Sequence, residues 1–126
     1  MKKAIATKNA PGAIGPYSQG TLSGDLVFVS GQIPLNPATG ELAGEDIKTQ
    51  TEQSLKNVKA VLEAAGCTMA DVLKSSVFLK DMNMFADMNG VYSSFFEEPY
   101  PARAAVEVAR LPKDVLVEIE VIARKS

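Results

Sequence analysis

Three residue types that carry much of enzyme chemistry are missing or almost missing from this chain. Its 126 residues include no histidine, no tryptophan and only one cysteine. The lack of histidine excludes imidazole bases, and with them serine and cysteine triads and histidine-bound zinc or iron. A catalytic site in this chain would therefore use carboxylates, arginine, hydroxyls, backbone groups and water.

The chain also lacks an excess of positive charge and long apolar runs. Its 13 basic and 15 acidic residues give a net charge of -2, which argues against nucleic acid as a partner. No run approaches the ~20 apolar residues of a membrane span, and residues 1–15 lack the apolar core of a secretory signal. Because the lone Cys67 cannot form an intrachain disulfide, we expect a cytoplasmic protein in which Cys67 is a packed core residue.

The content of 46% hydrophobic and 22% charged residues is typical of a single globular domain, here spanning 1–126. Hydrophobic periodicity and turn residues predict helices over 46–65, closed by Gly66, and over 81–97. The same signals predict strands over 3–7, 17–22, 26–30, 72–80, 102–108 and 115–124. This order predicts an α+β domain with a mixed sheet and both helices packed on one face.

The last two predicted strands suggest a site on the other face of the sheet. In 115–124, alternation places Glu118 and Glu120 opposite the core residues, and in 102–108 it places Arg103 and Glu107 together. We expect these four charged residues to share the face that the helices leave uncovered, which would then be an oligomer interface. Two interpretations are open: solvated ion pairs across strands, or an arginine that binds a substrate carboxylate beside a glutamate that transfers protons.

Several longer motifs resemble the RidA (YjgF) family of reactive intermediate deaminases. They are Gly-Pro-Tyr-Ser-Gln-Gly at 15–20, Ser-Gly-Gln-Ile-Pro at 30–34, Pro-Ala-Arg at 101–103, Val-Glu-Val-Ala-Arg-Leu-Pro at 106–112 and Val-Glu-Ile-Glu-Val-Ile-Ala at 117–123. The resemblance implies a homotrimer of chorismate-mutase-like subunits with sites between subunits. It also implies a cofactor-free, metal-free hydrolysis of enamines and imines, such as 2-aminoacrylate or 2-iminobutanoate, to 2-keto acids and ammonia.

By the same resemblance, Arg103 would bind the substrate carboxylate and Glu118 would activate water and relay protons. Tyr17, Ser30 and Gly31 would line the pocket, the last two through hydroxyl and backbone contacts; Asn89 would lie near it. Burial would raise the pKa of Glu118 and a nearby Arg103 would lower it, so the sequence leaves the direction open.

One position departs from the family pattern. Many members have a cysteine two residues after the arginine, where this chain has Ala105. A thiol-based step therefore cannot take place at this position. Carboxylate binding would survive, because the backbone N–H of Ala105 can act together with Arg103.

Two other functions compete with the deaminase. A non-catalytic trimer could use the Arg103 pocket to sense 2-keto acids and similar metabolites. The ribonuclease or translation-inhibitor activity for which relatives were named has less support, because the chain is acidic and has no basic-aromatic surface.

Overall fold

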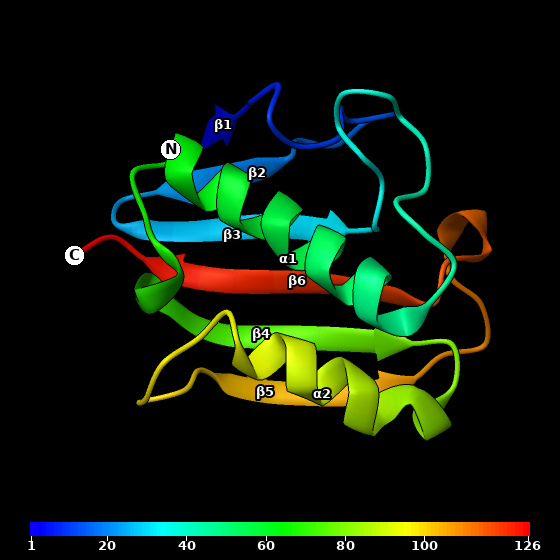
Figure 1. Cartoon of the computed structure of the whole chain (residues 1–126). Coiled ribbons are helices and arrows are strands. Elements are labelled where there is room, and N and C mark those ends of the chain that lie inside the picture. Colours follow the sequence, from blue (N-terminus) through cyan, green and yellow to red (C-terminus); the bar gives the residue numbers. More distant parts are fainter.

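A six-stranded mixed sheet carries two helices on one of its faces. The computed structural model describes residues 1–126, and Figure 1 shows both helices on the same side of the sheet. The strand order is β1-β2-β3-β6-β4-β5. The strands are β1 Lys3–Ile5, β2 Gly20–Ser23, β3 Leu26–Gln32, β4 Val72–Leu79, β5 Ala102–Glu107 and β6 Val117–Arg124. The predicted fold class and element order are therefore confirmed.

Helix α1 (Ile47–Ala64) forms where its amphipathic pattern predicts it. The side chain of Asp46 caps its N-terminus by accepting a hydrogen bond from the Thr49 N–H at 3.0 Å. Ala65 is the C-terminal cap, and Gly66 follows it with a φ of 83°, a conformation that favours glycine. The buried face of α1, which includes Leu55, packs on β3 and β6. Each fully buried leucine or valine there contributes roughly 1.5–3 kcal/mol to stability.

The second helix is shorter than the sequence predicts. A 3-10 turn over Met82–Met84 precedes α2, which spans only Phe85–Ser93. The hydroxyls of Ser93 and Ser94 donate to the carbonyls of Gly90 and Val91 at 2.9 Å and 2.6 Å. These side chains compete with backbone donors for the last carbonyls, which favours ending the helix there.

The position of β5 corrects the prediction about the charged residues. β5 does not lie beside β6; it pairs in parallel with β4 at the edge of the sheet. Arg103 is in register with Ser75, and Ser75 with the core residue Val121, so Arg103 points to the helix-covered face. Glu107 shares that face because side chains alternate along a strand.

Glu118 and Glu120 lie on the uncovered face, as predicted, but without Arg103 and Glu107. Their partners in register on β4 are Phe78 and Ser76. None of the three salt bridges of the chain involves these glutamates or Arg103. The predicted common face for all four charged residues is therefore wrong, and so is the alternative of ion pairing among them within one chain.

Neither helix combines the length and the hydropathy that a membrane-spanning segment requires.

Candidate functional site

The site residues that the sequence predicts fall into two groups in the folded chain. Tyr17, Ser30, Gly31 and Glu118 form one group, which we call the Glu118 half-site. Asn89, Arg103 and Ala105 form the other, which we call the Arg103 half-site.

The Glu118 half-site lies where the end of β3 meets the start of β6. The carboxyl group of Glu118 lies against Gly31 so closely that a Cβ at position 31 would be 2.9 Å from Cδ of Glu118. Carbon atoms in contact normally stay about 3.5–4.0 Å apart. Glycine at position 31 is therefore required for the position that the Glu118 side chain occupies.

Burial is the main cause of a raised pKa at Glu118, and the negative charge of Glu120 adds to it. The side chain is half-buried and has no cationic partner within the chain. Arg103 does not counter the shift, because it lies on the other face of the sheet. The direction that the sequence left open is thus upward in the single chain.

The loop that precedes β2 belongs to the same half-site. Tyr17 is exposed, and it lines a small cavity of about 60 Å³ together with Gly31. The Ser30 hydroxyl donates to the carbonyl of Ser18 at 2.6 Å and so holds this loop against β3. The hydroxyl oxygen can still accept a hydrogen bond. Gln19 is buried and donates to the carbonyls of Thr7, Ala10 and Pro11. The sequence motif placed Gln19 here but gave it no role.

Two buried amides of α1 hold the long loop after β3. Asn57 donates to the carbonyls of Ile33 and Leu35 at 3.2 Å and 3.0 Å. Gln50 donates to the Gly44 carbonyl and accepts from the Leu116 N–H at 2.8 Å. These bonds fix the backbone that follows Gly31 and the backbone that precedes Glu118.

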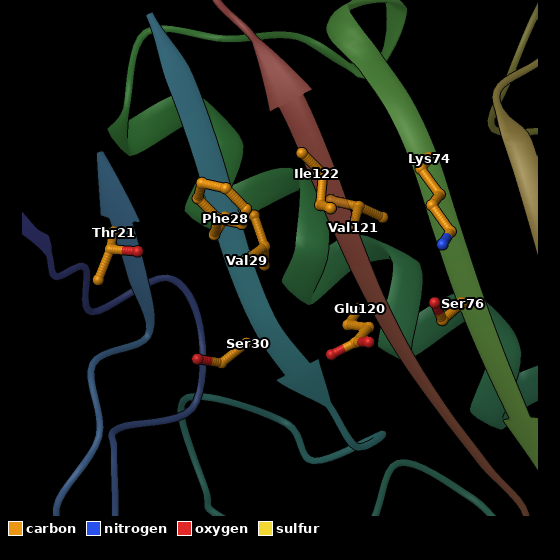
Figure 2. A pocket seen from close by; sticks show the side chains of 9 residues that line it. All are labelled: Thr21, Phe28, Val29, Ser30, Lys74, Ser76, Glu120, Val121 and Ile122. Carbon is orange, nitrogen blue, oxygen red and sulfur yellow. The ribbon is translucent and has the colours of Figure 1, made fainter. Parts of the chain in front are cut away.

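A shallow hollow extends from this region along the uncovered face. It has a volume of about 330 Å³ and is lined by nine residues of β2, β3, β4 and β6. Figure 2 shows Ser30, Glu120 and Ser76 on adjacent strands, with Lys74 and the apolar Phe28 and Ile122 further along the face. The uncovered face is therefore mixed: exposed apolar side chains such as Phe28 and Val106 flank a group of polar ones.

The Arg103 half-site is built between α2 and β5. The Nη1 atom of Arg103 donates to Oδ1 of Asn89 at 2.6 Å. The Cζ atom of the guanidinium lies 4.7 Å from the centre of the Tyr92 ring and 5.4 Å from that of Phe85, which is the range of cation–π contacts. Tyr100 helps to line the adjoining cavity of about 500 Å³.

Because β5 is an edge strand, alternate backbone N–H groups have no neighbouring strand. The Val108 N–H donates to the Leu79 carbonyl of β4 at 2.9 Å. N–H groups alternate in direction along a strand, so those of Arg103 and Ala105 point away from β4. An unpaired cation and a free N–H donor at one sheet edge suit an anionic group such as a carboxylate.

The two half-sites cannot meet within one chain. Arg103 and Glu118 are two strands apart, roughly 10 Å, and three residues apart along the strand direction, roughly 10 Å more. Their side chains also point to opposite faces of the sheet.

Sequence reasoning missed three residues near Arg103: Tyr92 and Phe85, which contact the guanidinium, and Ser75, its register partner on β4. A signal for two of them was present, because Phe85, Asn89 and Tyr92 follow the spacing of one helix face. No group of three or more aspartate, glutamate, cysteine or histidine side chains is arranged to hold a metal ion.

Comparison with known proteins identifies the family. A family model described as "Endoribonuclease L-PSP" matches residues 7–125. A RutC family protein of Pyrococcus horikoshii is 60% identical over 126 residues, covering 100% of both chains. The 2-iminobutanoate/2-iminopropanoate deaminase of Salmonella typhimurium is 57% identical over 126 residues and covers 98% of both, so this relative is an enzyme.

A solved structure gives the same result for the fold. Escherichia coli TdcF with bound serine superposes with a TM-score of 0.93 and is 54% identical, covering 98% of this chain and 99% of its own. The motifs, the fold and the full-length similarity agree. The chain therefore belongs to the L-PSP endoribonuclease family, the family of the RidA (YjgF) imine deaminases.

Proposed function

We propose that this protein hydrolyses small 2-imino acids to 2-keto acids and ammonia at a site shared between two copies of the chain. The observation that carries this proposal is the division of the site. One half offers an arginine that has no carboxylate partner, together with a free backbone N–H. The other half offers a carboxyl group with a raised pKa. Each half lacks what the other supplies.

The Arg103 half-site would bind the carboxylate of the imino acid. The guanidinium has one N–H engaged by Asn89, which leaves donors for a two-pronged contact with a carboxylate. The Ala105 N–H lies at the same sheet edge and adds a donor without needing a side chain. The absence of the family cysteine at this position therefore does not prevent substrate binding.

The Glu118 half-site would move the protons. Glu118, as a carboxylate, takes a proton from water while the water oxygen forms a bond to C2 of the protonated imine, which gives a carbinolamine. It returns this proton to the nitrogen, and the C–N bond then breaks. Ammonia leaves, and Glu118 takes up the hydroxyl proton, so that the 2-keto acid remains. Glu118 then passes this proton to the ammonia, which departs as ammonium and restores the carboxylate. A carboxyl group whose pKa is raised is a stronger base as the anion and still exchanges the proton, which suits both directions of transfer.

In this proposal a closed ring of copies joins the halves, and the family resemblance favours a trimer. The face of the sheet that lacks helices exposes Leu26, Phe28 and Val106 to 37%, 43% and 45%. A second copy would cover this apolar surface and bring its own Arg103 toward Glu118.

The activity is tested by generating imines with an amino-acid oxidase or a serine/threonine dehydratase and following their decay spectroscopically. We expect the protein to accelerate the decay, Arg103→Ala to abolish the acceleration, and Glu118→Gln to reduce it about 10²- to 10⁴-fold. No acceleration, or full acceleration by Arg103→Ala, would overturn the deaminase assignment. If 2-ketobutyrate still raises the melting temperature of an inactive protein through Arg103, the protein is a binder.

Sharing of the site is tested by mixing two inactive variants. Arg103→Ala and Glu118→Gln chains are unfolded together in equal amounts and refolded. In a closed ring, about a quarter of the interfaces then pair an intact Arg103 with an intact Glu118, so about a quarter of the wild-type activity should return. If no activity returns while each variant refolded with wild type stays active, both groups act within one copy.

A further inference from the structure

We infer that Tyr92, anchored by Ser75, is a positioning residue that sets the plane of the Arg103 guanidinium for carboxylate binding. The inference rests on the proposed function, because it concerns how the Arg103 half-site holds its ligand. It adds two residues that the family motifs did not point to.

Contacts from two directions determine the orientation of the guanidinium. The Tyr92 ring lies beneath it, with Cζ of Arg103 4.7 Å from the ring centre, and Phe85 flanks it at 5.4 Å. Stacking on a ring restricts tilting of the guanidinium plane. The 2.6 Å hydrogen bond from Nη1 to Asn89 restricts rotation within that plane. The remaining N–H groups are left for a ligand at the edge of β5.

The Tyr92 ring is itself held at its far end. Its hydroxyl forms a 2.6 Å hydrogen bond with the hydroxyl of Ser75, and both side chains are buried, at 5% and 1% exposure. Ser75 is the residue of β4 in register with Arg103 on β5. The anchor of the ring is therefore attached to the strand segment that neighbours the arginine, so ring and arginine keep a constant relative position.

Phe96, the aromatic neighbour of Tyr92, does not share the contact of Tyr92 with Arg103. Phe96 packs against Tyr92 with ring centres 4.6 Å apart and is equally buried, at 6% exposure. It makes no cation–π contact with Arg103, whose cation–π contacts are with Tyr92 and Phe85. Phe96 thus serves the core, and Tyr92 serves the core and the arginine.

Pre-orientation lowers the entropy that Arg103 loses when a ligand binds. Arg103 is exposed in the single chain and would be covered in the proposed assembly. Between these two limits, a cation–π contact corresponds to about a 3- to 30-fold change in binding. Removing the ring should therefore weaken carboxylate binding by that factor and leave the proton-transfer steps at Glu118 almost unchanged.

The test compares Tyr92→Leu with the matched control Phe96→Leu in the full assembled protein. Calorimetry measures the Kd of 2-ketobutyrate, and imine decay gives KM and kcat. We expect Tyr92→Leu to raise Kd and KM about 3- to 30-fold with kcat within about threefold of wild type. Phe96→Leu should lower the melting temperature without raising Kd. An unchanged Kd in folded Tyr92→Leu, or an equal rise in Phe96→Leu, overturns the inference.

A double variant keeps the test valid if Tyr92→Leu does not fold. Tyr92→Phe combined with Ser75→Ala keeps the ring but removes both hydroxyls of the anchor. We expect Kd to rise about two- to fivefold, less than for loss of the ring; a wild-type Kd in this double variant refutes the anchoring role. Because Kd is measured without turnover, a protein that binds 2-ketobutyrate but hydrolyses no imine refutes the proposed function alone. A wild-type protein that binds no 2-ketobutyrate refutes the inference about Tyr92, whereas imine decay decides the proposed function separately.

Discussion

Replacing Gly31 with alanine should inactivate the protein by moving the Glu118 carboxyl group. The backbone at position 31 does not have the positive φ that excludes alanine. The new methyl group would instead meet Glu118: it would overlap Oε2, which is the nearest atom, and lie 2.9 Å from Cδ and 3.2 Å from Cγ. The substitution therefore acts on one side chain and not on the backbone.

The size of the effect follows from these distances. To reach the normal carbon–carbon separation of about 3.5–4.0 Å, Cδ of Glu118 must move by about 0.6–1 Å. A misplacement of about 1 Å in a reacting group can reduce the rate 10²-fold, so we expect kcat to fall about 10- to 100-fold. The free energy of unfolding should change little, because two effects offset each other. A distorted Glu118 rotamer destabilises the fold by about 0.5–1.5 kcal/mol, and alanine in place of glycine stabilises it by about 0.4–1 kcal/mol by reducing the entropy of the unfolded chain.

The assay measures imine decay and the melting temperature of Gly31→Ala beside the control Gly90→Ala. A Cβ at Gly90 meets no atom within 4 Å, and glycine in a helix interior costs about 1 kcal/mol relative to alanine. The control should therefore be slightly more stable than wild type and fully active. The reasoning is refuted if Gly31→Ala keeps its activity within twofold, or if it loses activity only because it unfolds.

Further predictions concern stability and reactivity. Asn57→Ala should lower the free energy of unfolding in denaturant by about 2–4 kcal/mol, because it leaves two loop carbonyls without donors. The control Gln53→Ala, which removes only the donor to Asn57, should lower it less. Burial raises the pKa of Glu118 above 4.5, so the folded state holds this proton more tightly. The free energy of unfolding should then fall as the pH rises from 4.5 through the raised pKa, and thermal melts of Glu118→Gln should lack that fall. Burial also raises the pKa of the Cys67 thiol, so iodoacetamide should label it slowly at pH 7 and leave the activity unchanged.

The features that the sequence predicted well are those set by local periodicity. Alternation in 115–124 placed Val117 and Ile119 in the core and Glu118 on the opposite face, and all three positions are confirmed. Helix α1 follows its heptad-like apolar pattern to within one residue of each predicted end. A side chain's face within one element depends only on spacing, which the sequence contains.

The features that it missed depend on which elements lie side by side. The assignment of Arg103 to a face was wrong because alternation groups residues within a strand and does not say which strand is adjacent. β5 pairs in parallel with β4, in a register that sets Arg103 beside Ser75. Because Ser75 faces the helices, Arg103 does too, which is the opposite of the face that we expected. The aromatic residues beneath it were missed for the same reason, since only the packing of α2 on β5 brings Tyr92 to the guanidinium.

The lack of histidine, together with this division of the site, makes the pH dependence of the reaction a test of Glu118 in particular. The family chemistry needs a group that gains and loses a proton near neutral pH, and the chain has no imidazole for it. In the proposed mechanism Glu118 takes this role, and in the single chain burial raises its pKa, helped by the charge of Glu120. The acid limb of kcat/KM for imine hydrolysis should therefore report the titration of Glu118 in the assembly, where burial and Glu120 raise its pKa and the Arg103 of the neighbouring copy lowers it. Glu120→Gln should shift that limb to lower pH while keeping activity, because it removes the neighbouring negative charge. An acid limb that does not move in Glu120→Gln, or that persists unchanged in the residual activity of Glu118→Gln, would show that another group carries the proton.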